Sequence, residues 1–169
     1  LTDVKARKLW HDQRMARWSG DAPGQNPADT AWASAQNTRI RLRDWTLEHQ
    51  GEGLEARLRC TDFALSLNLT PSQPVLLQGD QGLSRKGPEV SQTSYYYSLP
   101  HLQVRGELEL RGKRHTVGAG STAWLDHEWS QEMLHPEAVG WDWIGINLLD
   151  GSALTAFRLR SQQGQTLWD

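Results

Sequence analysis

The segment 124–129, Trp-Leu-Asp-His-Glu-Trp, holds the densest group of side chains that could do chemistry. In an extended strand alternate side chains point to opposite faces, which would place Trp124, Asp126 and Glu128 together on one face. His127 would lie on the other face. Two carboxyl groups this close repel each other when both are ionised, so one of them is favoured to keep its proton. A protonated carboxyl beside indole rings could act as a general acid.

The same segment also fits a purely structural role. Asp126 or Glu128 could cap a turn or pair with an arginine, and His127 could bond a backbone carbonyl. A short motif by itself is a hypothesis. The spacing therefore leaves both interpretations open.

A second cluster, Gly-Trp-Asp-Trp-Ile-Gly, lies at 140–145. Alternation would place Trp141 and Trp143 on one face of a strand and Asp142 on the other. Aspartate is disfavoured in strands and needs a partner when buried. The two indoles could form the wall of a ligand pocket, or they could fill the end of a sheet.

A third cluster runs from the glycine-rich segment 79–88 to the three consecutive tyrosines 95–97. The glycines lack the spacing of a nucleotide-binding loop, and no helical pattern follows them. Three tyrosines in a row must point to both faces of a strand, so at least one hydroxyl is expected to face the interior and to need a partner there. Tyr96 is the middle candidate, opposite in parity to Tyr95 and Tyr97.

Composition excludes several other functions. The 18 Lys and Arg against 20 Asp and Glu give a net charge of −2, which provides no basic field for nucleic acid. The single cysteine, Cys60, rules out an internal disulfide, and the six histidines show no ligand motif. No apolar run is long enough to span a bilayer. We therefore expect no metal, no cofactor, no nucleic-acid partner and no transmembrane segment.

Positioning these clusters requires strands, and from residue 38 the apolar pattern has a period of two. A change of parity predicts a bulge near Arg43 and Asp44. Residues 50–53 predict a hairpin turn, and 19–37 read as a long loop. Residues 1–18 fit neither period, and the absence of an initiator Met and of a tail leads us to expect a fragment of a longer protein. About nine short strands with little helix predict an all-β, antiparallel barrel or sandwich.

The clusters together resemble the AttH-like family, which is related to hydroxyneurosporene synthase, a carotenoid hydratase. The resemblance rests on 74–82, on Ser-Arg-Lys-Gly at 84–87 leading to Ser-Tyr-Tyr-Tyr-Ser at 94–98, on 123–129 and on 140–143. These motifs match in order and spacing from about Leu1 to Arg160.

This resemblance implies a lipocalin-like (calycin-type) barrel or half-open sandwich, the first of two such domains. Residues 1–169 would make up most of that domain, with its first strands and the second domain absent. The family is often exported, which implies a periplasmic or secreted protein, lipid-anchored in some relatives and associated with an export system or the membrane periphery. Its partners would be a hydrophobic small molecule and the second domain of the same protein.

The residues and the resemblance together give the candidate site. The catalytic candidates are Asp126 as proton donor, His127 and Glu128 tuning it, and Tyr96 completing the hydrogen-bond network. The substrate-binding candidates are Trp124, Trp129, Trp141, Asp142, Trp143, Tyr95, Tyr97, Arg85 and Lys86. We expect an isoprenoid or otherwise unsaturated ligand that is hydrated or isomerised by acid–base chemistry without a cofactor. The alternatives are a non-catalytic carrier of a hydrophobic ligand in the cell envelope and a carbohydrate-binding module.

Overall fold

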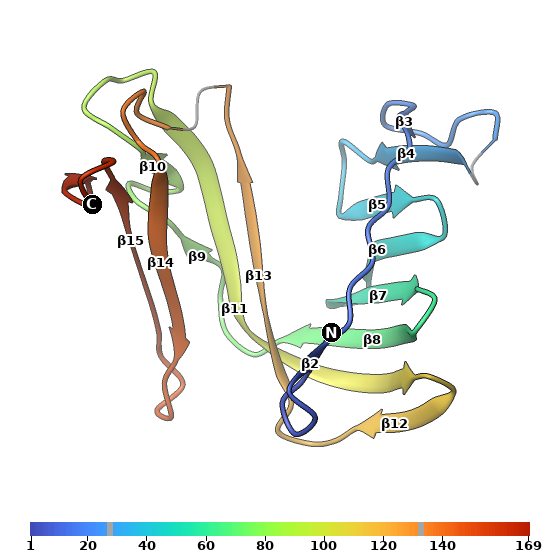
Figure 1. The fold of residues 1–169 in the computed structure, drawn as a ribbon. Helices are drawn as coiled ribbons and strands as arrows, with labels where there is room; N and C mark the ends of the chain where they lie inside the picture. Colours follow the sequence, from blue (N-terminus) through green and yellow to red (C-terminus); the bar gives the residue numbers. More distant parts are fainter. Residues whose placement is uncertain (27–28, 132–133) are drawn as a thin grey trace. The chain divides into compact units, whose positions relative to one another are not determined.

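The computed structural model describes residues 1–26, 29–131 and 134–169 (Figure 1). The described residues form strands joined by turns and contain no α-helix, which confirms the all-β prediction. These strands do not close into a barrel, and of the two expected forms the half-open sandwich is the one that agrees with them. No helix in this part of the chain is long and apolar enough to cross a membrane.

The strands, in chain order, are β1 (Thr2–Asp3), β2 (Lys8–Leu9), β3 (Arg17–Trp18), β4 (Thr30–Ala33), β5 (Arg39–Leu42), β6 (Trp45–Gln50), β7 (Gly53–Arg59), β8 (Phe63–Pro71), β9 (Leu76–Leu77), β10 (Leu83–Arg85), β11 (Thr93–Leu110), β12 (Lys113–Val117), β13 (Thr122–Trp129), β14 (Gly140–Asn147), β15 (Ala153–Arg160) and β16 (Thr166–Trp168). The successive pairs from β4 to β8 are antiparallel, as are β14–β15 and β15–β16, whereas β3 and β4 run parallel.

The chain divides into two compact units. Unit 1 comprises Leu1–Thr70 and Gln103–Thr122, and in it β4 to β8 form an antiparallel meander to which β12 is joined through β11. Trp32, Leu54 and Leu69 are buried because the alternating pattern turns the apolar positions of these strands to one side.

Two expectations about unit 1 were wrong. The parity change at Arg43 and Asp44 is a hairpin turn rather than a bulge: Leu42 pairs with Trp45, and Arg43 has a φ of +57°, which such a two-residue turn requires. The predicted loop 19–37 also contains a strand, β4. Its buried tryptophan and its pairing with β5 outweigh the loop-like composition on either side.

Unit 2 comprises Pro71–Leu102 and Ala123–Asp169 and contains two sheets. In the first, β11 pairs with β9 and β10 on one edge and with β13 on the other. The second is β14–β15–β16. The core includes Leu102 and Leu159, which are almost fully buried. Contacts such as that between Lys86 and Phe157 join the two sheets, so unit 2 is a small two-layer structure.

Strand β11 is longer than the sequence predicted, because 94–98 and 102–110 belong to one continuous strand of 18 residues. Pro100 lies in its middle and is buried, and its carbonyl accepts a hydrogen bond of 2.8 Å from the Asn147 amide. Proline is unusual in the middle of a strand because it cannot donate a backbone hydrogen bond. The strand contributes residues to both units.

Gly106 in β11 provides a test of this arrangement. Its φ is +138°, and a Cβ atom there would lie 2.1 Å from the backbone oxygen of Ser66. Gly106→Ala should lower the free energy of unfolding by about 2 kcal/mol or more, because strain and a backbone clash add together. Gly112→Ala, where φ is +80° and no atom lies within 4 Å, should cost about 1 kcal/mol from strain alone. Urea unfolding measures both; equal losses would contradict the close approach of β11 and β8.

Candidate functional site

The faces of β11 and β13 divide the candidate residues into two groups. Tyr96 and its same-parity neighbours Ser94 and Ser98 are buried, whereas Tyr95 is 57% exposed. On β13 the side chains of Asp126 and Glu128 bond to the buried serines of β11. His127 instead bonds the hydroxyl of Tyr97. Residues that are adjacent in the sequence of β11 or β13 therefore lie on opposite faces of the sheet and in different groups.

Asp126 is the centre of the first group; it is itself exposed and bonds the buried side chains of β11. Its Oδ1 accepts hydrogen bonds from the Ser98 hydroxyl at 2.5 Å and from the Trp124 indole at 2.7 Å. The Tyr96 hydroxyl also bonds this carboxyl. Ser98 is held in turn by the Gln78 amide at 2.9 Å. The carboxyl is thus fixed by donors from the two strands β11 and β13, while its Oδ2 is not used by the serine or the indole.

Tyr96 is the most strongly perturbed acid of the site. Burial, with the negative charge of Asp126 next in importance, raises its pKa from 10.0 to about 12. The bond from Trp143 acts in the opposite direction, and Glu128 adds to the rise. The Tyr96 hydroxyl therefore keeps its proton at neutral pH and lies between an indole and a carboxyl.

A second polar group adjoins the first. The Lys86 ammonium lies 2.9 Å from Oε1 of Glu128, and its side chain is only 9% exposed. The hydroxyl of Ser94 bonds the same carboxylate oxygen at 2.5 Å. The ammonium also lies 4.1 Å from the ring centre of Phe157 and 5.0 Å from that of Tyr96, within the range of cation–π attraction.

These groups border a cavity of about 120 Å³ within unit 2. Both sheets and the segment after β13 line it, through Lys86, Tyr96, Glu128, Leu134, Trp141, Trp143, Phe157 and Leu159. A cavity of this size and apolar character takes a small hydrocarbon fragment rather than a whole lipid.

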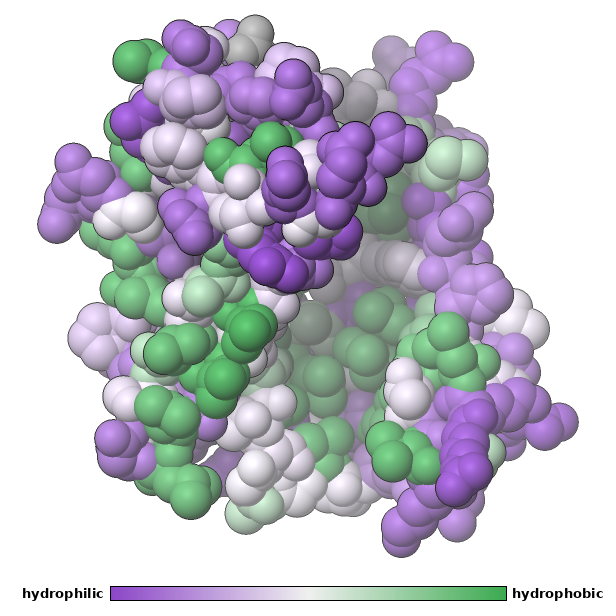
Figure 2. Space-filling view, turned by 60° about the vertical axis from the view of Figure 1, so that its left-hand side comes forward, coloured by the Kyte–Doolittle hydropathy of each residue, from purple (hydrophilic) through white to green (hydrophobic). Residues whose placement is uncertain are grey.

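The cavity is open beside β14. Trp141 is 59% exposed and Trp143 is also exposed. Figure 2 shows apolar side chains gathered in parts of the surface, between regions dominated by hydrophilic side chains. A ligand longer than the cavity can continue along the exposed indoles.

Several candidates do not line the cavity, among them Asp142, Arg85 and His127. Asp142 points to the other face of β14 and pairs with Arg158 at 2.7 Å and Arg160 at 3.0 Å. The hydrogen bond from Arg158 and the charge of Arg160 hold the pKa of Asp142 below its usual value. Arg85 bonds the Pro88 carbonyl and covers the ring of Trp168. His127 is separated from Asp126 by the alternation of β13.

His127 belongs to an aromatic cluster on the opposite face of β11 and β13. Tyr95 and Trp129 are stacked with their ring centres 5.5 Å apart, and His127 lies 4.8 Å from Trp129. Tyr97 contacts both His127 and Trp129 edge-on. The structure thus brings Tyr95, Tyr97 and Trp129 together, but not with Asp126.

Sequence reasoning missed the apolar contributions from β15 and from the segment after β13, namely Phe157, Leu159 and Leu134. The period of two in 154–159 was a signal that Phe157 and Leu159 share one face. It could not show which sheet they would meet.

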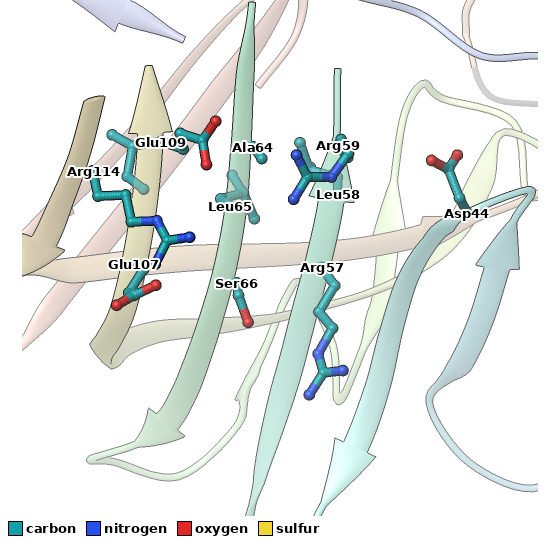
Figure 3. Close-up of a pocket in the computed structure, with 11 residues that line it drawn as sticks. Asp44, Arg57, Leu58, Arg59, Ala64, Leu65, Ser66, Glu107, Glu109 and Arg114 are labelled. Carbon is teal, nitrogen blue, oxygen red and sulfur yellow. The ribbon is translucent and has the colours of Figure 1, made fainter. Parts of the chain in front are cut away.

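Unit 1 has a larger cleft of about 390 Å³, shown in Figure 3. Arg57 and Arg59 of β7 lie on one side, Glu107 and Glu109 of β11 on the other, and the small side chains of β8 lie between them. Arg57 also pairs with a neighbouring glutamate on its own strand. These charged side chains are mostly exposed, as on a solvated sheet face, so the cavity of unit 2 is the better candidate site.

The AttH-like family matches this sequence over residues 1–169. The chain belongs to the AttH-like family. A crystal structure of a candidate AttH protein from Nitrosomonas europaea is 45% identical, with a TM-score of 0.85 over 98% of this chain and 49% of that one. Kievitone hydratase from Nectria haematococca is 13% identical, with a TM-score of 0.56 over 80% of this chain and 47% of that one, which shows a shared fold. No curated protein matches the chain significantly.

The AttH-like chain spans about half the length of both solved proteins. The family assignment agrees with the resemblance carried by the motifs at 84–98, 123–129 and 140–143. Each of these three motifs contributes side chains to the cavity of unit 2. The first provides Lys86 and Tyr96, the second provides Glu128, and the third provides the indoles of β14.

The environment of Tyr96 in this AttH-like chain can be tested by titration. The absorbance change of tyrosinate that is lost in Tyr96→Phe should have its midpoint at about pH 12. In Asp126→Asn the midpoint should fall toward 10, because a neighbouring negative charge is removed, whereas the exposed control Asp62→Asn should leave it unchanged.

The raised pKa of Tyr96 also makes the stability of the fold depend on pH. The unfolded chain releases the Tyr96 proton near pH 10 and the folded chain holds it until about pH 12, so the contribution of this group to stability is lost as the pH rises through that window. A midpoint near 10 in the wild type would contradict the buried position of the hydroxyl.

Proposed function

We propose that the cavity of unit 2 binds the unsaturated end of a hydrophobic small molecule and catalyses, without a cofactor, the addition of water to its double bond or the movement of that bond. The observation that carries the proposal is the hydrogen-bonded pair of Tyr96 and Asp126 at the wall of an apolar, aromatic cavity. The shared fold with a hydratase supports it.

Proton delivery is the first requirement of such a reaction. Tyr96 reaches the cavity and Asp126 lies directly behind it. A phenolate is unfavourable here because burial and two carboxyl groups raise the Tyr96 pKa to about 12. In the proposed step the Tyr96 hydroxyl gives its proton to the alkene as it receives another from the carboxyl group of Asp126, which takes up a proton before each turnover.

The alkene π electrons form the new C–H bond and leave a positive charge on the second carbon. The faces of Trp143, Trp141 and Phe157 line the cavity and would stabilise that charge. Water then adds to the cation, and its surplus proton passes to the carboxylate of Glu128, from which the Tyr96–Asp126 pair is recharged. Loss of a proton from a neighbouring carbon to the same carboxylate instead gives the isomer. Hydration consumes only water, and isomerisation consumes no reagent.

The proposal concerns the full-length protein, because this chain is about half the length of its solved relatives. It includes an exported location and a second lipocalin-like domain, as the family resemblance implies. His127 and the cluster that it shares with Trp129 would support β13 from the other face rather than touch the ligand.

A carrier without catalytic activity is the second candidate. It is favoured by the hydrogen bonds of Asp126, since a carboxyl with three donors can serve to tie β11 and β13 together. In that case Asp126→Asn should lower the free energy of unfolding, and neither the wild type nor the variant should form product.

Product formation separates the two candidates. Full-length protein would be incubated with a panel of acyclic terpenes and carotenoids in ¹⁸O-labelled water and the products analysed by mass spectrometry. Asp126→Asn and Tyr96→Phe should each reduce label incorporation by about 10²-fold, as expected for loss of a general acid. Asp62→Asn, an exposed carboxyl in unit 1, should retain it.

Equal labelling by the wild type and Asp126→Asn would remove Asp126 from the mechanism. No labelled product from any member of the panel, together with tight binding of one of them, would support the carrier.

A further inference from the structure

The cavity of unit 2 is apolar except on the side where Lys86 and Glu128 reach it. The Lys86 side chain is only 9% exposed, whereas that of Glu128 is 31% exposed. A buried ammonium loses its hydration, and an ion pair offsets that loss only in part, so the stability of the sheet alone does not account for a lysine at this place. A contact with a ligand would account for it.

The Lys86 ammonium has unused hydrogen-bonding capacity. It carries three N–H donors, and among the described residues Glu128 supplies its one acceptor, at 2.9 Å. The rings of Phe157 and Tyr96 lie near its other sides, at 4.1 and 5.0 Å. Aromatic faces attract a cation but leave N–H donors without an oxygen acceptor. An oxygen atom in the cavity would complete this set.

The chain holds Lys86 firmly for such a role. Its backbone N–H donates to the Gln92 carbonyl at 2.6 Å, and Gln92 is buried. Gly87 has no side chain, and a Cβ there would lie 2.1 Å from the Gln92 side-chain oxygen, so the turn can close tightly. Ser94 fixes Glu128, the partner of the ammonium, from the neighbouring strand. A donor that is already positioned binds an acceptor with little further loss of freedom.

We propose that this cavity selects a ligand bearing a hydroxyl or carbonyl oxygen close to its double bond, and that Lys86 donates a hydrogen bond to that oxygen. This inference rests on the proposed function and narrows its substrate class from hydrocarbons in general to oxygenated alkenes. The ammonium lies 5.0 Å from the ring centre of Tyr96, so the oxygen and the double bond must belong to one small fragment. Lys86 is then a specificity-determining residue.

A matched pair of probes tests the proposal. Geraniol carries a hydroxyl one carbon from a double bond, and 2,6-dimethyl-2,6-octadiene has the same carbon skeleton without the oxygen. Binding to the full chain would be followed by quenching of tryptophan fluorescence, because Trp141 and Trp143 line the cavity. The wild type should bind geraniol about tenfold more tightly than the hydrocarbon, as expected for a hydrogen bond to a charged donor.

Variants assign that preference to Lys86. The double variant Lys86→Met with Glu128→Gln removes the donor without leaving an unpaired carboxylate at the cavity wall, and its preference for geraniol should fall to about onefold to twofold. Its affinity for the hydrocarbon should stay the same or rise. Lys113→Met, at an exposed position of β12, should keep the tenfold preference. If circular dichroism shows that the double variant does not fold, Lys86→Gln replaces it and should also lose most of the preference.

Two kinds of result would contradict the proposed contact between Lys86 and the ligand oxygen. Equal binding of both probes by the wild type, or an unchanged preference after replacement of Lys86, would overturn the oxygen contact and leave the proposed hydrophobic site intact. Absence of quenching by both probes would overturn the contact and the proposed site together.

Discussion

Side chains of a β-strand alternate between the two faces of a sheet, and the site of this protein depends on that alternation in β11 and β13. One parity of β11 places Ser94, Tyr96 and Ser98 in the interior, where they meet carboxyl groups of β13. The other parity places tyrosines against an imidazole and an indole. A shift of one residue in register would exchange the two sets, so the pairing of these strands decides which chemistry faces the cavity.

The polar group of β11 and β13 combines buried residues, Ser94, Tyr96, Ser98 and the nearby Lys86, with the exposed carboxyl-bearing residues Asp126 and Glu128. Asp126 is bonded by a hydroxyl, an indole and a phenol, and Glu128 by a hydroxyl and an ammonium. Buried polar groups destabilise a fold when their partners are missing, but complete networks make it rigid. Burial, followed by the negative charge of Asp126, raises the pKa of Tyr96 to about 12, so this hydroxyl keeps its proton. These properties suit a site that moves protons in an apolar environment.

Alternation made part of this arrangement predictable. The pattern in 95–97 predicted that a tyrosine would turn inward, and the structure places Tyr96 there. Residues 30–33 and the continuity of β11 through Pro100 were not predictable, because local composition opposed strands that tertiary packing stabilises. The pairing of Lys86 with Glu128 joins positions 42 residues apart, and the approach of Phe157 depends on the meeting of two sheets. Neither contact leaves a local pattern in the sequence.

The central claim is that the buried polar face, rather than the exposed aromatic face, meets the ligand. A crystal structure of the full-length protein with bound geraniol tests it most directly. The account predicts a double bond against the Tyr96 hydroxyl, beside Trp143 and within the cavity of unit 2. Electron density for the ligand stacked on Tyr95 and Trp129, with the cavity unchanged, would contradict the account.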